Sequence, residues 1–345
     1  MTPALTSLGW DEYFAAAFEP LCHTHVVARV TAADRGMVDC ATDGGTVRAG
    51  IRLGGETPVT GDWVALVDDG AHWWVDVVLP RRTAVSRAVA NGRSDAQVLA
   101  ANIDVVVIAV PVQPEPRPGV VERFVALAWD SGATPVVAVT KYDLTRDADA
   151  IVADVAEAAV GVTVIGVSAV TGTGIEELRS HVPAGRTACL LGRSGAGKST
   201  LVNALVGSEL LATADVRRDG KGRHTTTRRE LVALPGAGAL VDTPGLRGAG
   251  LWTAEEGLEK TFADVEELVT ACRFSDCGHD SEPGCAVLLA VDEGRLTQRR
   301  FDSWRKLQRE ARWMATRADA RLRSEQRRAW KLVHLEVRRS GRIRP

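Results

Sequence analysis

Hydrophobic and polar residues follow two different patterns along this chain. Between residues 25 and 80, short apolar and β-branched runs are broken by turn residues, as in HVVARVTAADRG and GDWVALVDD. Several short strands at this spacing predict a small β-barrel. Pro80 and the two arginines that follow it end this first pattern.

The second pattern covers residues 83–250. Apolar runs alternate with stretches of helical periodicity, such as residues 120–130 and 175–182. The predicted strands are residues 104–112, 135–140, 162–169, 187–191 and 239–245. This alternation is typical of a parallel sheet covered by helices. After Gly250 the chain becomes rich in helical patterns, and we predict that it runs into a long basic helix.

The composition is that of a folded protein with more than one domain. The chain has 345 residues, of which 45% are hydrophobic and 25% are charged, enough for two or three domains with a core each. Its first residues have no basic stretch, and its longest apolar runs, such as residues 105–112, are far shorter than a membrane span. We therefore expect a cytoplasmic protein that does not enter a membrane.

Charge is distributed unevenly between the two ends. Residues 298–345 hold 16 Lys or Arg against 5 Asp or Glu, although the whole chain has a formal net charge of only −2. Such a helix is often only a solvated face, but a local balance of +11 on an otherwise acidic protein favours contact with a polyanion, most often nucleic acid.

Residues 192–199 read GRSGAGKS and match the phosphate-binding pattern G-x-x-x-x-G-K-[ST]. They follow the predicted strand 187–191 and open a helical segment, which is the context that this motif requires. Backbone N–H groups turn toward the β-phosphate, Lys198 reaches the β and γ oxygens, and Ser199 binds Mg²⁺. The predicted nucleotide-binding residues here are Gly192, Arg193, Ser194, Gly195, Ala196, Gly197, Lys198, Ser199 and Thr200.

Two further loops point to guanine as the base. TKYD follows the strand 135–140, and an SA pair follows the strand VTVIGV. Together they resemble the base-reading loops of GTPases, in which an Asp carboxylate accepts hydrogen bonds from N1–H and the exocyclic amine of guanine, a donor pair that adenine lacks. The predicted guanine-binding residues are Thr140, Lys141, Tyr142, Asp143, Ser168 and Ala169.

The remaining nucleotide elements come in an unusual order. Residues 242–245 read DTPG, an element in which Asp242 holds Mg²⁺ through water and the Gly245 N–H meets the γ-phosphate. Residues 222–227 read GRHTTT, and Thr226, or else its neighbour Thr225, is the predicted residue that closes on Mg²⁺. Because the base loops precede the phosphate loop, whereas ordinary GTPases have them after it, the sequence predicts a circular permutation. A permuted chain keeps its sheet, since contacts rather than chain order define the fold.

Three of the six cysteines lie between residues 272 and 285, and the spacing Cys272-x4-Cys277-x-His279-x5-Cys285 supplies three thiolates and one imidazole. Four protein ligands suit a closed tetrahedral Zn²⁺ site that is structural rather than catalytic. We expect one such zinc ion, in addition to Mg²⁺ bound with GTP.

These motifs together resemble the ribosome small-subunit-dependent GTPase family known as RsgA or YjeQ. The resemblance covers roughly residues 25–310 and includes GDWV, LPRRT, QVLAANID, TKYD, SA, GRSGAGKST, GRHTTT, DTPG and the Cys/His cluster. It implies a multidomain α/β protein with an N-terminal OB-fold β-barrel, a circularly permuted P-loop GTPase domain and a C-terminal helical zinc-binding domain. The expected division is an N-terminal extension (1–24), the OB-fold (25–82), the GTPase domain (83–250), the zinc-binding domain (251–310) and a basic tail (311–345).

The resemblance also implies a function. The expected protein hydrolyses GTP in late maturation of the small ribosomal subunit, binds that subunit through RNA, and acts as a monomer. An RNA-binding assembly checkpoint that uses GTP mainly as a conformational ligand is the alternative, and an unrelated ATPase or kinase is a third reading that TKYD disfavours. Leu246 stands where many GTPases have a water-orienting Gln, so His224 of GRHTTT is the candidate for that role, with Lys198 as the other catalytic residue.

Overall fold

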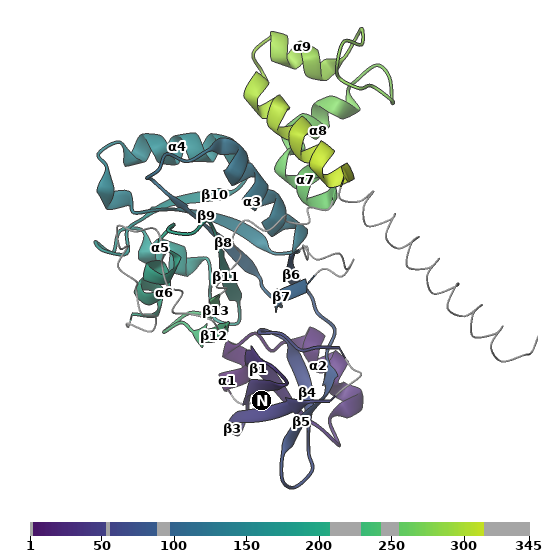
Figure 1. The fold of residues 1–345 in the computed structure, drawn as a ribbon, viewed down its shortest axis with the longest axis vertical. Coiled ribbons are helices and arrows are strands. Elements are labelled where there is room, and N and C mark those ends of the chain that lie inside the picture. Colours follow the sequence, from purple (N-terminus) through teal and green to yellow (C-terminus); the bar gives the residue numbers. More distant parts are fainter. Residues whose placement is uncertain (1–2, 53–55, 88–96, 208–228, 243–254, 314–345) are drawn as a thin grey trace, which may run out of the picture.

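The computed structural model describes residues 3–52, 56–87, 97–207, 229–242 and 255–313. An N-terminal barrel, a central sheet with helices on both faces, and a C-terminal helical region follow one another along the long axis of the molecule (Figure 1). Within the ranges just given, no helix combines the length and the apolar character needed to cross a membrane.

The barrel confirms the first hydrophobic pattern. Its strands are β1 (Val26–Asp34), β2 (Met37–Thr42), β3 (Gly45–Ile51), β4 (Trp63–Asp68) and β5 (Trp73–Val78). They pair in the order β1-β2-β3-β5-β4, and β4 pairs back with β1, so the barrel is closed. Alternate side chains such as Val30, Cys40 and Leu66 fill its interior. A closed five-stranded barrel of this kind fits the predicted OB-fold.

A helical layer covers one side of the barrel. It consists of α1 (Pro3–Ser7), α2 (Glu12–Phe18) and a 3-10 turn, η1 (Glu19–Leu21). Asp11 caps α2 by accepting hydrogen bonds from the backbone N–H groups of Tyr13 and Phe14, and Trp10 packs edge-on against Trp63 with ring centroids 4.8 Å apart. The pattern of residues 1–24 did not predict this layer, because its aromatic residues find their partner only in the folded barrel.

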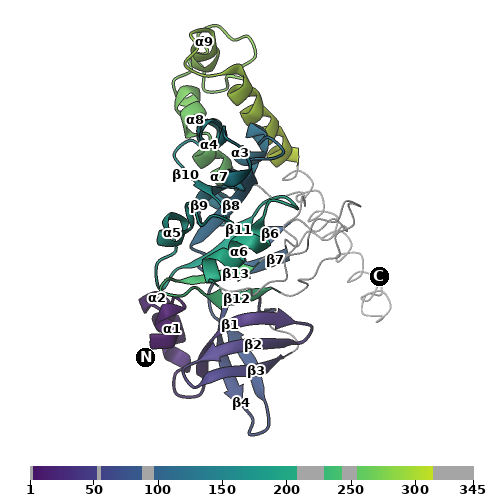
Figure 2. The same ribbon diagram turned by 90° about the vertical axis from the view of Figure 1, so that its left-hand side faces the viewer.

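The central sheet confirms the second pattern. Its strands are β8 (Val105–Pro111), β9 (Thr134–Thr140), β10 (Thr163–Val167), β11 (Thr187–Leu191), β12 (Glu230–Ala233) and β13 (Ala239–Asp242). The order is β10-β9-β8-β11-β13-β12, and all neighbours are parallel except β12, which runs antiparallel to β13. β12 also pairs with β1 of the barrel, at Ala32 and Glu230, so the barrel and the central sheet are hydrogen-bonded to each other (Figure 2).

Two layers of helices cover the central sheet. Helices α3 (Pro118–Asp130) and α4 (Ala148–Ala158) bury one face, where Phe124 and Val155 pack on Val106 and Ile108. Helices α5 (Ile175–Ser180) and α6 (Lys198–Val206) bury the other. Both faces of β8 are buried, which explains its continuous apolar sequence. A two-stranded ribbon, β6 (Ala84–Arg87) with β7 (Gln97–Ala101), stands apart from the main sheet.

The C-terminal region is helical, as the sequence predicts. It contains α7 (Glu255–Thr261), α8 (Ala263–Thr270), α9 (Ala286–Asp292) and a further helix over residues 298–313. Phe262, Phe301 and Trp304 form its core together with Ala126 of α3, so this region is packed onto the central sheet's helical layer. The basic tail beyond residue 313 lies outside the described residues.

Candidate nucleotide site and metal centre

The parallel strands bring the separate sequence motifs to one edge of the central sheet. TKYD begins at the end of β9, the SA pair follows β10, the phosphate loop follows β11, and DTPG begins at the end of β13. Because parallel strands have their carboxyl ends at the same edge, motifs up to about 100 residues apart in the chain meet there. The ends of strands in an open α/β sheet are where ligands bind.

The phosphate loop has the backbone that its glycines predict. Gly192, at φ +146, passes so close to β8 that a β-carbon would lie 2.5 Å from the Ala109 carbonyl oxygen. Gly197, at φ +81, caps α6, so that the helix begins at Lys198. The Lys198 ammonium donates hydrogen bonds of 2.8 Å to the carbonyl oxygens of Gly192 and Arg193. The Lys198 ammonium therefore lies against the phosphate loop. A phosphate oxygen there would be a stronger acceptor than these two carbonyl oxygens.

The base loop is attached directly to the phosphate loop. Thr140 is buried, and its hydroxyl donates a 2.7 Å hydrogen bond to the carbonyl oxygen of Ala196. Lys141 adopts a left-handed conformation, at φ +59, which starts the 3-10 turn η2 (Tyr142–Leu144). GTPase base loops more commonly have an asparagine at the position of Thr140. In this chain the threonine hydroxyl instead links the two loops that would hold the base and the phosphates.

The second base loop supports the aspartate that is predicted to read guanine. The buried Ser168 hydroxyl donates a 2.5 Å hydrogen bond to Oδ1 of Asp143. Its oxygen in turn accepts from the backbone N–H groups of Val170 and Thr171. Asp143 itself is exposed, so its second oxygen, Oδ2, is available to a base edge.

Tyr142, the third residue of TKYD, also has a structural role that the motif alone did not reveal. The Tyr142 ring lies on Gly166 of β10, where a β-carbon would come within 2.6 Å of the ring. The Tyr142 hydroxyl hydrogen-bonds to Asp149, and this bond raises the pKa of the phenol.

The structure describes only some of the remaining predicted nucleotide-binding residues. Asp242 ends β13 and pairs with Glu230 across the strands. Gly245, His224 and Thr226 lie outside the described residues, as does Leu246. Their assignments stay predictions.

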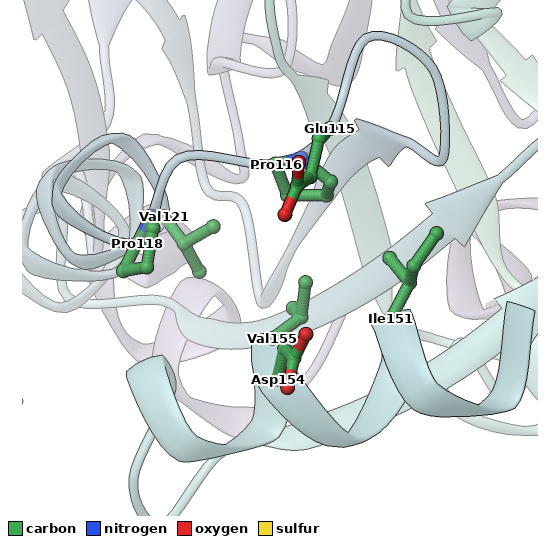
Figure 3. A pocket seen from close by; sticks show the side chains of 7 residues that line it. All are labelled: Glu115, Pro116, Pro118, Val121, Ile151, Asp154 and Val155. Atoms are coloured by element: carbon green, nitrogen blue, oxygen red, sulfur yellow. The ribbon is translucent and has the colours of Figure 1, made fainter. Parts of the chain in front are cut away.

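A small pocket lies between α4 and the loop that leads into α3 (Figure 3). The residues that line it are Glu115, Pro116, Pro118, Val121, Ile151, Asp154 and Val155. None of them is a predicted nucleotide-binding residue, and the two carboxylates would repel phosphates. This pocket is therefore not the nucleotide site.

The four predicted metal ligands converge in the C-terminal region. Cys272 lies beyond the end of α8, and Cys285 caps α9, with Sγ 3.5 Å from the N–H of Leu288. The four ligand atoms all lie within 4.8 Å of one another, with His279 Nδ1 3.6 Å from Cys272 Sγ and 3.4 Å from Cys285 Sγ. Tetrahedral bonds of about 2.0–2.3 Å put ligand atoms roughly 3.5–3.8 Å apart. The cluster therefore fits a metal ion, and burial lowers the pKa of His279, which favours the neutral imidazole that a metal requires.

A carboxylate that sequence reasoning missed shapes the turn between these ligands. Glu282 accepts hydrogen bonds from the backbone N–H groups of Gly278, Asp280 and Ser281, at 2.8 to 3.0 Å. Hydrogen bonds from backbone N–H groups, those of Ser281 and Asp280 first, lower its pKa to about 2. His279 within this turn has φ +55. An acidic residue among the ligands gave no signal in the sequence, because its role depends on the folded turn.

The order of the motifs along the chain and the order of the strands in the sheet define a circularly permuted GTPase with an N-terminal barrel and a C-terminal Cys/His cluster. The same fold is found in a crystal structure of YjeQ from Thermotoga maritima, which is 27% identical with a TM-score of 0.63 and matches 83% of this chain and 98% of that one. A structure of YloQ, described as a circularly permuted GTPase, has a TM-score of 0.62 at 23% identity, over 84% of this chain and 96% of that one.

Sequence comparisons give the family. Residues 78–252 match the family model described as RsgA GTPase. A protein of Streptomyces avermitilis named small ribosomal subunit biogenesis GTPase RsgA is 50% identical, with 95% of this chain and 91% of that protein covered. A protein of Methanosarcina acetivorans with the same name is 35% identical, over 96% and 92% of the two chains. The chain belongs to the RsgA GTPase family.

Proposed function

We propose that this GTPase binds GTP at the carboxyl edge of the central sheet and hydrolyses it during biogenesis of the small ribosomal subunit. One observation supports the site most strongly: Thr140 ties the base loop to the phosphate loop, and Ser168 orients Asp143 beside them. Hydrogen bonds thus link three motifs from separate parts of the sequence, which supports their proposed role in binding one nucleotide. The biological role rests on the relatives, which carry the name small ribosomal subunit biogenesis GTPase.

Within this site the residues take distinct roles. Lys198 neutralises the β and γ oxygens as negative charge builds on them, and the backbone N–H groups of the phosphate loop hold the β-phosphate. Ser199, Asp242 and Thr226 are the residues that would hold Mg²⁺, whose chemistry is to neutralise charge shared by the β- and γ-phosphates. Gly245 would donate its N–H to the γ-phosphate.

Phosphate binding is tested through Lys198. Lys198→Ala should lower kcat for GTP hydrolysis by about 10²-fold or more, because catalysis of this reaction is mainly electrostatic. Lys260, which is exposed and paired with Glu256 on α7, supplies the control, and Lys260→Ala should leave kcat unchanged. Equal activity of the two variants would remove the phosphate loop from the reaction.

Base recognition is tested through Asp143. Asp143→Asn should weaken GTP binding and improve binding of xanthosine triphosphate, whose ring presents an acceptor at that position. Asp154→Asn, an exposed change on α4, should alter neither affinity. If the unmodified protein binds ATP and GTP equally, Asp143 does not select the base.

Water activation is assigned to His224, because Leu246 replaces the glutamine that would orient water. A neutral imidazole can accept a hydrogen bond from the attacking water at pH 7. His224→Ala should lose turnover that the small subunit stimulates while it retains affinity for a non-hydrolysable GTP analogue and for the subunit. Full stimulation of that variant would exclude His224 from the mechanism.

The metal of the Cys/His cluster is proposed to be a single structural Zn²⁺. Three thiolates and an imidazole leave no open coordination position, so the ion would stabilise the C-terminal region rather than act on a substrate. Elemental analysis should find one zinc per chain, and Cys277→Ala should lose it together with protease resistance after residue 254. Cys22→Ala, at an exposed cysteine far from the cluster in sequence, should lose neither.

The role on the ribosome is tested by GTP turnover with and without purified small subunits. Strong stimulation supports a GTPase that times its own release, whereas tight binding without stimulation would favour the RNA-binding checkpoint. The division into OB-fold, GTPase and zinc-binding domains, contact with rRNA, action as a monomer and residence in the cytoplasm are part of this proposal.

A further inference from the structure

A loop of the barrel touches the central sheet at one buried threonine. Thr60 is 1% exposed, and its hydroxyl donates a 3.2 Å hydrogen bond to the carbonyl oxygen of Arg229. The Thr60 carbonyl accepts from the N–H of Ala101, and the Gly61 N–H donates to Val30 within the barrel. Both sides of Thr60 are therefore held by main-chain hydrogen bonds, and its side chain points at the start of β12.

The backbone that Thr60 holds is also the neighbour of DTPG. Glu230 pairs with Ala32 of β1 on one side and with Asp242 of β13 on the other. β12 thus lies between the barrel and the strand that ends in Asp242, an arrangement that Figure 2 shows from the side. The barrel stands one strand away from the first residue of that motif.

The same backbone continues the other nucleotide-sensing motif. GRHTTT ends at Thr227, two residues before Arg229 in the sequence. The short stretch from Arg229 to Glu230 therefore follows one motif closely in sequence and pairs with the first residue of the other.

We propose that Thr60 is a positioning residue for GTP hydrolysis, which the barrel supplies to the central sheet. Its hydroxyl fixes the backbone at Arg229 and, through the strand pairing of Glu230, the place of Asp242. This inference rests on the proposed roles of GRHTTT and DTPG. Small displacements of groups that orient a reaction are costly in rate even when they arise far from the reacting atoms.

The test compares Thr60→Val with Thr60→Ser. Valine keeps the shape and removes the hydroxyl, whereas serine restores it. Thr60→Val should lower kcat for GTP hydrolysis about tenfold and leave the affinity for a non-hydrolysable GTP analogue within about twofold, since the base and phosphate loops are untouched. Thr60→Ser should recover most of kcat. Thr46→Val, an exposed threonine on β3, should match the unmodified protein.

Turnover is expressed per nucleotide-binding site, counted with a labelled analogue, so that loss of folded protein does not imitate a slower reaction. Unchanged kcat in Thr60→Val would overturn the inference, and so would a loss of kcat that serine does not recover. Lys198→Ala separates this outcome from failure of the proposed site. If Lys198→Ala stays active, the nucleotide site itself is wrong, whereas an inactive Lys198→Ala beside a fully active Thr60→Val refutes only the role of Thr60.

Discussion

The barrel and the C-terminal region are each attached to the central sheet and its helices at one contact region, called a joint below. The two joints consist of different kinds of interaction. The barrel is joined by strand pairing, by main-chain hydrogen bonds and by Arg29, which is 1% exposed. Arg29 donates to the carbonyl oxygens of Leu8 and Asn102 and to the Thr187 hydroxyl, and no carboxylate is among these partners. Burial lowers its pKa to about 10, which leaves it charged at neutral pH.

The C-terminal region is joined by an ion network. Arg300 is 3% exposed and donates to both oxygens of Asp264 and to Glu122 of α3, which is fully buried. Arg299 donates to the same Glu122 oxygen. Burial by itself would lower the pKa of Arg300, but the hydrogen bonds that Arg300 donates to Asp264 and Glu122, together with the charges of these carboxylates, raise it instead.

The comparison shows two ways to bury an arginine at a domain joint. At the barrel the cation is hydrogen-bonded only to neutral groups and lies 5.0 Å from the face of Trp63. Its removal therefore takes no hydrogen-bonded partner from a carboxylate, although the charges of Asp104 and Asp62 also act on it. At the C-terminal joint the cation compensates two carboxylates. Loss of one partner there leaves charge uncompensated, which is far more costly.

The largest expected effect is that of Arg300→Met. This change removes the cation that Glu122 and Asp264 share, which leaves Arg299 as the cation beside the buried Glu122. It should lower the free energy of unfolding of the C-terminal region by about 3–5 kcal/mol. Denaturant unfolding, followed by protease susceptibility of residues 255–313, measures it. Arg295→Met removes an exposed ion pair with Glu293 and should change stability by less than about 0.5 kcal/mol. Similar values for the two variants would show that the buried network is not compensated as described.

The next effect is that of Gly61→Ala at the barrel joint. Gly61 has φ +93, and a β-carbon there would lie 2.1 Å from the Ala101 carbonyl oxygen. Gly70, at φ +87 on the hairpin between β4 and β5, has open space at the same point. Both alanines carry about 1–2 kcal/mol of backbone strain, but Gly61→Ala should cost about 1–3 kcal/mol more, because the joint must open. Thermal unfolding of the pair measures this difference, and equal destabilisation would mean that the joint is not tightly packed.

The smallest effect of the three is that of Arg29→Met. It removes the donor to the acceptors at Leu8, Asn102 and Thr187, which should lower the free energy of unfolding by about 1–3 kcal/mol. No carboxylate loses a hydrogen-bond partner. Measured beside Arg300→Met under the same conditions, it should be the milder change. A larger loss for Arg29→Met would reverse the distinction between the two joints.

Much of this fold and site could be predicted from local sequence. Strand 187–191 was predicted at its observed bounds, and helix 120–130 begins only two residues earlier in the structure. The four predicted metal ligands were identified by spacing alone, and their ligand atoms lie together as expected. Such features depend on a short stretch of chain, in which periodicity predicts the element, and glycines or ligand types predict the loop or the metal site.

Other features were decided only by the tertiary structure. Residues 3–21 gave no sign of the helical layer that they form on the barrel, and nothing near Arg29, Glu122 or Arg300 marks these residues as joints. Thr140 was predicted as a residue of the base loop alone, yet in the fold its hydroxyl donates a hydrogen bond to the phosphate loop. The sequence by itself determined the elements and the chemistry of each motif, because local residue types carry that information. Which side chains are buried together, and whether a charge meets a carboxylate or a carbonyl, depends on contacts between segments far apart in the chain, and only the folded structure brings these together.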